Sequence, residues 1–288
     1  MIHRNYYCLI AGLPDIIPDD KKLQYSAEEL RDYLQGELYP SDFRLVEMLY
    51  LPWDHENLIN LLFESEFDWD DRGNFARELI EQFVNKKEFE FLDVSVFPSY
   101  FIDFIEYFHE DEEGVAKADS IRFLTEGWYQ HLRHSGNAFI SRLAGYKQNI
   151  GNIMLALNGR KHDIHFEEAL IGDDEVTYAL RKSRARDFGL SSEIDDIENI
   201  VQIFEMENLL DRELKIDNHF WKFLDEITFF NYFTIEKVLA FVEKAFIVER
   251  WYELDKEKGQ ALFNQLLEEL QSNFEFPEEF AITYGKRK

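Results

Sequence analysis

The sequence is poor in residues that form disulfides, break helices or bind anions. Its 288 residues include one cysteine, six prolines and 13 glycines, and 31 Lys and Arg stand against 58 Asp and Glu. With Cys8 alone, an intramolecular disulfide and a cysteine-based zinc site are excluded. Because Cys8 lies in a short apolar stretch, we expect it to be buried and unreactive. The scarcity of glycine and proline favours long helices over a many-stranded sandwich.

The charge balance limits the classes of partner. The formal net charge is −27, and a field of that sign repels nucleic acid and anionic lipid headgroups, because their binding depends on Lys and Arg. We therefore expect no nucleic-acid partner and no direct lipid anchoring. The N-terminal segment lacks the pattern of a signal peptide, and there is no run of about 18 apolar residues, the length that crosses a bilayer. These features predict a cytoplasmic protein.

Apolar residues at helical spacing are what the sequence has in abundance. Hydrophobic residues make up 45% and aromatic residues 16% of the chain, with 27 Phe, which is ample material for a packed core. The pattern predicts a mostly all-α protein made of multi-helix bundles. We expect one elongated helical protein over residues 1–288, with possible sub-bundles at 1–115, 116–190 and 191–288.

Cap signals place some of the elements in the first half. Ser26 followed by two glutamates predicts a helix start, and separate helices are expected after Ser41 and after Asp54. Residues 88–97 have the sequence EFEFLDVSVF, which alternates partly between polar and apolar residues. This segment is the best candidate for a strand, so we expect minor strand content there.

The middle of the chain divides into a helical and an irregular part. Residues 118–157 have a helical pattern with expected interruptions at Gly136, Gly145 and Gly151. Residues 158–190 are more charged and less regular. We expect them to form a loop-rich connection or hinge between the two halves of the chain.

A long helix is predicted over residues 234–254. Its apolar residues extend round more than one side, so it should be contacted from several directions, and only Glu236, Lys237, Glu243 and Lys244 form a polar strip. Near the end of this helix, three charged residues lie on the face that is apolar in its earlier turns. We expect the helix to leave the core there, because buried charges need partners. The alternative is that these three charged residues, Glu249, Arg250 and Glu253, stay in the fold and meet partners there.

Basic residues are scarce, so their positions are informative. The densest cluster lies in the loop-rich connection and consists of Arg181, Lys182, Arg184 and Arg186. On so acidic a chain it is a candidate docking patch for a partner protein, and we count it as partner-binding together with Glu249, Arg250 and Glu253. The alternative is a solvated loop whose charges offset nearby acids such as Asp173.

No motif indicates catalysis. The glycine-rich phosphate-binding patterns, the Gly-x-Ser-x-Gly elbow and the His-Glu-x-x-His zinc motif are all absent. We therefore expect a protein that is not an enzyme and has no catalytic, cofactor-binding or metal-binding residues. The alternative is a metal-dependent enzyme that uses two pairs of histidines spaced three residues apart. A metal site needs three or four ligands, and nothing in the sequence brings the pairs together: His131, His134, His162 and His165.

Two blocks carry a resemblance to a known family. Residues 6–14 (YYCLIAGLP) and residues 233–259, with the pairs Arg250-Trp251 and Leu254-Asp255, resemble the two ends of an uncharacterised bacterial family whose genes lie among those for V/A-type ATPase subunits. That family is similar to the C subunit of archaeal V/A-type ATPases, called d in eukaryotes. The resemblance implies an all-helical, funnel-shaped protein of three related bundles, without catalytic residues.

The resemblance also implies a place of action. Such a subunit sits between the membrane rotor ring and the central stalk and transmits torque through protein–protein contacts. We therefore expect a non-catalytic V/A-type ATPase (ATP synthase) subunit without a cofactor, peripheral on the inner face of the cell membrane through the ATPase complex. The alternative is an assembly factor that touches the complex only during construction.

Overall fold

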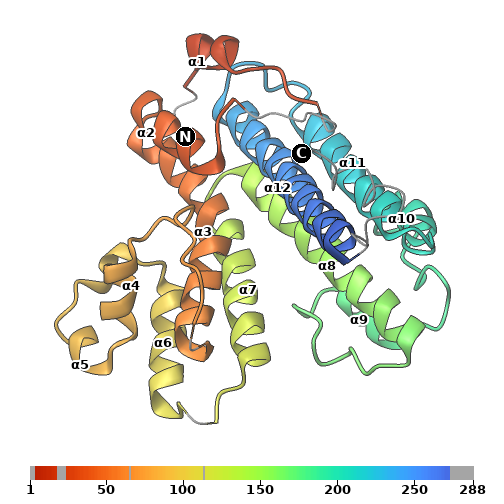
Figure 1. Ribbon diagram of the computed structural model, residues 1–288, viewed down its shortest axis with the longest axis horizontal. Helices are drawn as coiled ribbons and strands as arrows, with labels where there is room; N and C mark the ends of the chain where they lie inside the picture. Colours follow the sequence, from red (N-terminus) through yellow and green to blue (C-terminus); the bar gives the residue numbers. More distant parts are fainter. Residues whose placement is uncertain (1–3, 18–23, 65, 113, 273–288) are drawn as a thin grey trace, which may run out of the picture.

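The computed structural model describes residues 4–17, 24–64, 66–112 and 114–272, with side chains described up to Leu254. Among these residues it has twelve α-helices, one short 3-10 helix and no strand (Figure 1). The predicted all-α fold is confirmed. No helix in the described part combines the length and the apolar character that crossing a membrane would need.

The helices differ greatly in length, and the longest are in the middle and at the end of the described chain. Their order is α1 (Tyr7–Gly12), α2 (Ala27–Glu37), α3 (Pro40–Phe63), α4 (Arg77–Val84), α5 (Lys86–Phe89), η1 (Val94–Val96), α6 (Ser99–Glu110), α7 (Lys117–Arg133), α8 (Ala138–His162), α9 (Glu175–Lys182), α10 (Ile197–Phe204), α11 (Leu209–Ile227) and α12 (Ile235–Ser272).

The described helices form two large hydrophobic cores that share α8, and a third, small cluster packs α11 against α12 around Trp221 and Val248. The larger core joins α2, α3, α6 and α7 to the first turns of α8 and α12, through fully buried residues such as Leu30, Phe101 and Val238. The smaller core packs the second half of α8 against α9 and α10, around Ile153 and Leu180. In Figure 1, α3, α6 and α7 lie side by side at the lower left, and α8 and α12 cross the centre.

The cap predicted at Ser26 is present as a reciprocal capping box. The Ser26 hydroxyl accepts a hydrogen bond from the Glu29 amide (3.2 Å), and the Glu29 carboxylate accepts one from the Ser26 amide (2.9 Å). Two of the amides that a helix leaves free at its start are thereby satisfied. This fixes the N-terminus of α2, which packs on both α3 and α12.

The two helices expected after Ser41 and Asp54 are a single helix, α3. It continues through Pro52 without interruption. A proline inside a helix normally breaks or kinks it, because the ring displaces the preceding turn and the amide hydrogen is missing. Here the carbonyl of Met48 accepts a hydrogen bond from the Trp128 indole instead (2.8 Å), so the prediction of a break was wrong.

The strand predicted over residues 88–97 is also wrong, because this segment forms the end of α5 and the short η1. The Asn85 side chain accepts a hydrogen bond from the Lys87 amide (3.0 Å), and Asp93 accepts one from the Ser95 amide (3.1 Å). These caps start two short helical turns. A strand would have needed a neighbouring strand to pair with, and the described residues contain none.

The glycine predictions hold at one position of three. Gly136 has a φ of 73° and separates α7 from α8, as expected. Gly145 and Gly151 lie inside α8, where a Cβ would meet no atom within 4 Å, so neither interrupts the helix. Cys8 is exposed on α1, contrary to the expectation of a buried thiol.

Candidate functional site

A groove of about 590 Å³ lies between α8, α11 and α12, and α3, α7 and the loop of residues 66–76 also line it. We call it the central groove. Its lining combines aromatic rings with charged groups of both signs, which is the composition expected of a binding site. The charged residues are Arg72, Lys147, Asp217, Glu243, Glu249, Arg250 and Glu253.

Arg72 reaches the groove because buried polar groups on α3 hold its loop in place. The Asn57 side chain donates to the Asp70 carbonyl (2.8 Å) and accepts from the Asp70 amide (2.9 Å). Asp54, fully buried, accepts from the Phe75 amide (3.1 Å). Arg31 donates to the Arg72 carbonyl from α2 (2.9 Å). The backbone polar groups on both sides of Arg72 thus have hydrogen-bond partners. They hold the backbone of Arg72 in place, and its side chain extends from a fixed position.

Asp54 also explains why the loop carries a glycine at position 73. A Cβ on Gly73 would lie 2.5 Å from Oδ1 of Asp54, well inside van der Waals contact. The loop can therefore approach α3 this closely only without a side chain at that point.

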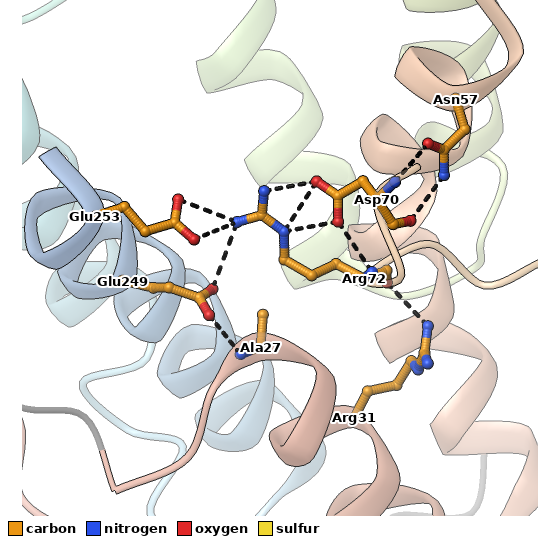
Figure 2. A network of polar contacts seen from close by, with 7 residues as sticks. All are labelled: Ala27, Arg31, Asn57, Asp70, Arg72, Glu249 and Glu253. Atoms are coloured by element: carbon orange, nitrogen blue, oxygen red, sulfur yellow. Dashed lines mark hydrogen bonds and ion pairs between the residues drawn. The ribbon is translucent and has the colours of Figure 1, made fainter. Parts of the chain in front are cut away.

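The Arg72 guanidinium joins this loop to α12 (Figure 2). Its Nε and Nη2 donate to the Asp70 carboxylate, the shortest contact being 2.6 Å. Only Nη1 points to α12, where it lies 3.3 Å from Oε1 of Glu253 and 3.9 Å from Oε2 of Glu249. Burial alone would raise the pKa of Asp70, but the hydrogen bonds from Arg72 outweigh it and lower that pKa.

Glu249 is buried at the point where α12 meets the start of α2 (Figure 2). Its Oε1 accepts a hydrogen bond from the Ala27 amide (2.9 Å), one of the free amides of the α2 N-terminus. Burial raises the pKa of Glu249, and this hydrogen bond and the Arg72 charge partly offset the increase. Our expectation that α12 leaves the core here was wrong for Glu249, which is only 8% exposed, whereas Arg250 and Glu253 are exposed as expected.

Two further ion pairs connect α12 to the other walls of the groove. Lys147 on α8 lies 2.9 Å from Oε2 of Glu243, which is 2% exposed. Arg250 donates to Asp217 on α11, and the neighbouring Trp251 indole donates to the same carboxylate oxygen (2.6 Å). Glu243 was predicted to belong to a polar strip, so its burial corrects that expectation too.

The candidate residues on α12 therefore come together, and their main partners were not predicted. Glu249, Arg250 and Glu253 all line the central groove. Arg72 and Lys147 escaped notice because each is an isolated cation far from α12 in the sequence. The one available signal was the presence of charged residues on the apolar face of the helix. If such a helix stays in the core, these charges need partners.

The basic cluster lies elsewhere, on and after α9. Arg181 pairs with Asp173 (2.8 Å), and Arg186 pairs with Glu205 (2.6 Å) and Glu198. For these two arginines the structure agrees with the interpretation that the loop charges offset nearby acids. Two cluster residues are exposed and have no ion pair within the described residues: Lys182 and Arg184. A role of this cluster in docking stays a prediction.

The histidine pairs lie in different surroundings. His131 is partly buried beside Tyr100, with ring centres 5.8 Å apart, and burial lowers its pKa. His134 lies at the end of α7, next to the Gln130 carbonyl. His162 is exposed as the last residue of α8, and His165 is exposed in the segment that follows. In the described part of the chain, no three His, Cys, Asp or Glu side chains are grouped so that they could hold a metal ion.

A second surface feature is an exposed cluster of aromatic side chains where α1 meets the connection between α11 and α12. We call it the aromatic patch. Its residues are 41% to 83% exposed: Tyr7, Phe229, Phe230, Tyr232 and Phe233. The Tyr6 amide donates to the Phe233 carbonyl (2.7 Å), and the rings of Tyr7 and Phe233 are 4.7 Å apart. Both segments lie at the top of Figure 1.

Comparison with known proteins assigns the chain to a family. No curated protein and no solved structure matched it. The model of one protein family matches residues 3–274, which is nearly the whole chain, and the description of that family is "Protein of unknown function (DUF2764)". The chain with this central groove and aromatic patch therefore belongs to the DUF2764 family.

Proposed function

We propose that this protein is a non-catalytic accessory subunit of a V/A-type ATPase, similar to the C or d subunit, that couples the central stalk to the membrane rotor ring. The observation that carries the proposal is the aromatic patch. The all-helical fold agrees with what the resemblance implies. A funnel-shaped arrangement of related bundles, and a position at the inner face of the membrane through the ATPase complex, are part of the same proposal.

The aromatic patch has the chemistry of a protein–protein contact. Single exposed apolar residues are common on proteins, but contiguous apolar patches mark interaction sites. Tyr and Phe are enriched at interfaces, and residues with large rings often supply much of the binding energy. Phe230 is 83% exposed, and its ring packs edge-on against that of Phe229, with ring centres 4.9 Å apart. A partner that covers these rings would gain the free energy of their burial.

The position of the patch links it to the resemblance. Tyr7 belongs to residues 6–14 and Phe233 begins residues 233–259, the two blocks that resemble the ATPase-associated family. These blocks are more than 200 residues apart in the sequence, yet they touch. The two distinctive segments form one surface where they meet. This supports the proposal that a partner protein binds both segments together.

Affinity purification from the native host tests the proposal. The tagged protein, extracted in mild detergent, should bring down stalk and ring subunits of the V/A-type ATPase, as measured by quantitative mass spectrometry. Recovery of the wild-type protein without these subunits would contradict the proposal. An assembly factor would instead be present in partly built complexes and missing from the mature enzyme.

A matched pair of variants tests the aromatic patch itself. The double substitution Phe229→Ser/Phe230→Ser should reduce recovery of the partner subunits at least about fivefold. The reason is that aromatic rings covered by a partner often supply much of the binding energy. The control is Phe91→Ser, which removes a ring that is 88% exposed outside the patch and should leave recovery unchanged. Equal recovery with all three proteins would mean that the patch is not the contact surface.

A further inference from the structure

The central groove holds more carboxylates than cations. Four acids line it, Asp217, Glu243, Glu249 and Glu253, against three bases, Arg72, Lys147 and Arg250. One of the bases is already committed, because Arg72 gives Nε and Nη2 to Asp70. Its Nη1 alone serves two carboxylates on α12, at 3.3 Å and 3.9 Å. The negative charge of the groove is therefore only partly compensated.

One of these carboxylates has an unsatisfied oxygen. Glu243 is 2% exposed and uses Oε2 to pair with Lys147 (2.9 Å). Its Oε1 is buried and accepts no hydrogen bond within the described part of the chain. A buried acceptor without a donor destabilises the structure, and such groups are rare in folded proteins. A bound hydrogen-bond donor would remove this penalty.

In two ion pairs of the groove the acid is more buried than the base, whereas Glu253 is more exposed than Arg72. The Glu243 side chain is 2% exposed and that of Lys147 is 26% exposed. In the second pair, the Asp217 side chain is 10% exposed and that of Arg250 is 50% exposed. Lys147 and Arg250 can therefore shift towards water at small cost, whereas Glu243 and Asp217 stay in place. An entering cation could share or replace their contacts.

Aromatic rings of the groove already stabilise cations. The Lys147 ammonium lies 5.3 Å from the centre of the Phe220 ring, and the Arg72 guanidinium lies 5.1 Å from the Trp53 ring. Such separations give favourable cation–π interactions. The rings of Trp53 and Phe246 pack edge to face, 4.6 Å apart, so this part of the wall is both apolar and electron-rich.

We propose that the central groove binds an organic cation, a guanidinium or alkylammonium group, which donates to the carboxylates of α11 and α12 and lies against the aromatic rings. The volume of about 590 Å³ would admit the whole of such a molecule. A metal ion is a poorer fit, because no suitable cluster of ligands exists among the described residues. The proposal does not depend on the ATPase assignment.

Calorimetric titration with a matched pair of small molecules tests the proposal. Both molecules are used with an acetylated α-amine. Argininamide then carries the guanidinium as its one charge, and citrullinamide has nearly the same shape with a neutral urea group. Argininamide should bind at least about tenfold more tightly, a difference of about 1.4 kcal/mol. Equal affinities, or no binding of argininamide at millimolar concentration, would overturn the proposal. A capped tripeptide with a central arginine, in a parallel titration, distinguishes a partner's side chain from a free small molecule as the source of the cation.

Variants locate the site. Glu243→Gln removes the buried charge and should weaken argininamide binding at least about tenfold. Glu253→Gln changes a half-exposed residue, is compatible with folding, and should weaken binding about threefold. The control, Glu198→Gln, neutralises an exposed carboxylate that pairs with Arg186 outside the groove and should have no effect. If the Glu253→Gln protein folds and binds argininamide as tightly as the wild-type protein, the assignment of the site to the central groove is contradicted. This holds whether or not the Glu243→Gln protein folds.

Discussion

The indole of Trp128 donates a hydrogen bond to the main-chain carbonyl of Met48 at 2.8 Å. This carbonyl lacks its helical donor, because the residue four positions later is Pro52, which has no amide hydrogen. The hydrogen bond comes from α7 and supports α3 at its weakest point. It explains how a helix of 24 residues continues through a proline.

This relationship predicts coupling between Trp128 and Pro52. Trp128→Phe should lower the free energy of unfolding by about 1–3 kcal/mol, because it leaves the Met48 carbonyl without a donor. In a Pro52→Ala background the amide of residue 52 can supply that donor, so the same substitution should be less harmful by about 1 kcal/mol. Urea unfolding of the four proteins measures the difference. Additive effects would show that the indole contributes only through packing.

The loop that carries Arg72 should be sensitive to a single methyl group. Gly73→Ala places a Cβ 2.5 Å from Oδ1 of Asp54, and the resulting displacement should destabilise the protein by about 1–3 kcal/mol. The control is Gly145→Ala inside α8, where a Cβ meets nothing within 4 Å. That change should stabilise the protein by about 0.5–1 kcal/mol, because alanine favours helix. Thermal unfolding compares them, and similar melting temperatures would refute the close approach.

Asp54 should make stability depend on pH near neutrality. Burial raises the pKa of Asp54 from 3.8 to about 7. Since the folded pKa lies above the unfolded one, the folded state holds the proton more tightly. The stabilisation from this group is complete below about pH 4 and is lost as the pH rises towards about 7. The free energy of unfolding, taken relative to Asp54→Asn, should therefore fall by up to about 1.4 kcal/mol per pH unit across that range.

The comparison with Asp54→Asn is necessary because the adjacent His55 acts in the opposite direction. Burial lowers the pKa of His55 to about 3, so its contribution to stability is lost as the pH falls below about 6.5. This contribution is the same in both proteins and cancels in the difference. Urea unfolding at pH 5, 6, 7 and 8 supplies the curves. Parallel curves for the two proteins would mean that Asp54 titrates near its ordinary value.

Arg72 should hold α12 against the first bundle. Arg72→Gln should lower the free energy of unfolding by about 1–3 kcal/mol, because Asp70 loses its charged donor and buried Glu249 loses its nearest cation. The penalty should be smaller in a Glu249→Gln background, because the side chain at position 249 then carries no charge that needs a cation. Arg77→Gln breaks an exposed pair with Glu81 and should change stability by less than about 0.5 kcal/mol. Chemical denaturation of the four proteins measures this double-mutant cycle. A penalty that does not depend on residue 249 would show that Arg72 does not stabilise the Glu249 carboxylate.

Local signals in the sequence were reliable where helix formation itself is local. The capping box at Ser26 needs only Glu29, three residues away, and it was predicted. The wide apolar surface of α12 was also predicted, since residues such as Val238 and Val242 recur at helical spacing and are fully buried. The partial alternation of residues 88–97 misled, because a strand depends on a neighbour that periodicity cannot reveal.

The sequence by itself determined a mostly helical protein and where several of its helices begin, among them α2, α3 and α12. Tertiary structure alone decided how its exceptions are accommodated. Pro52 is tolerated because of a donor that approaches Met48 from 80 residues away, and Glu249 can be buried because an amide 222 residues away donates a hydrogen bond to its carboxylate. The central groove arises in the same way, since Lys147 and Glu243 meet only when α8 and α12 pack. Helix formation depends on neighbours along the chain, whereas the burial of a charge depends on partners that only the folded chain brings near.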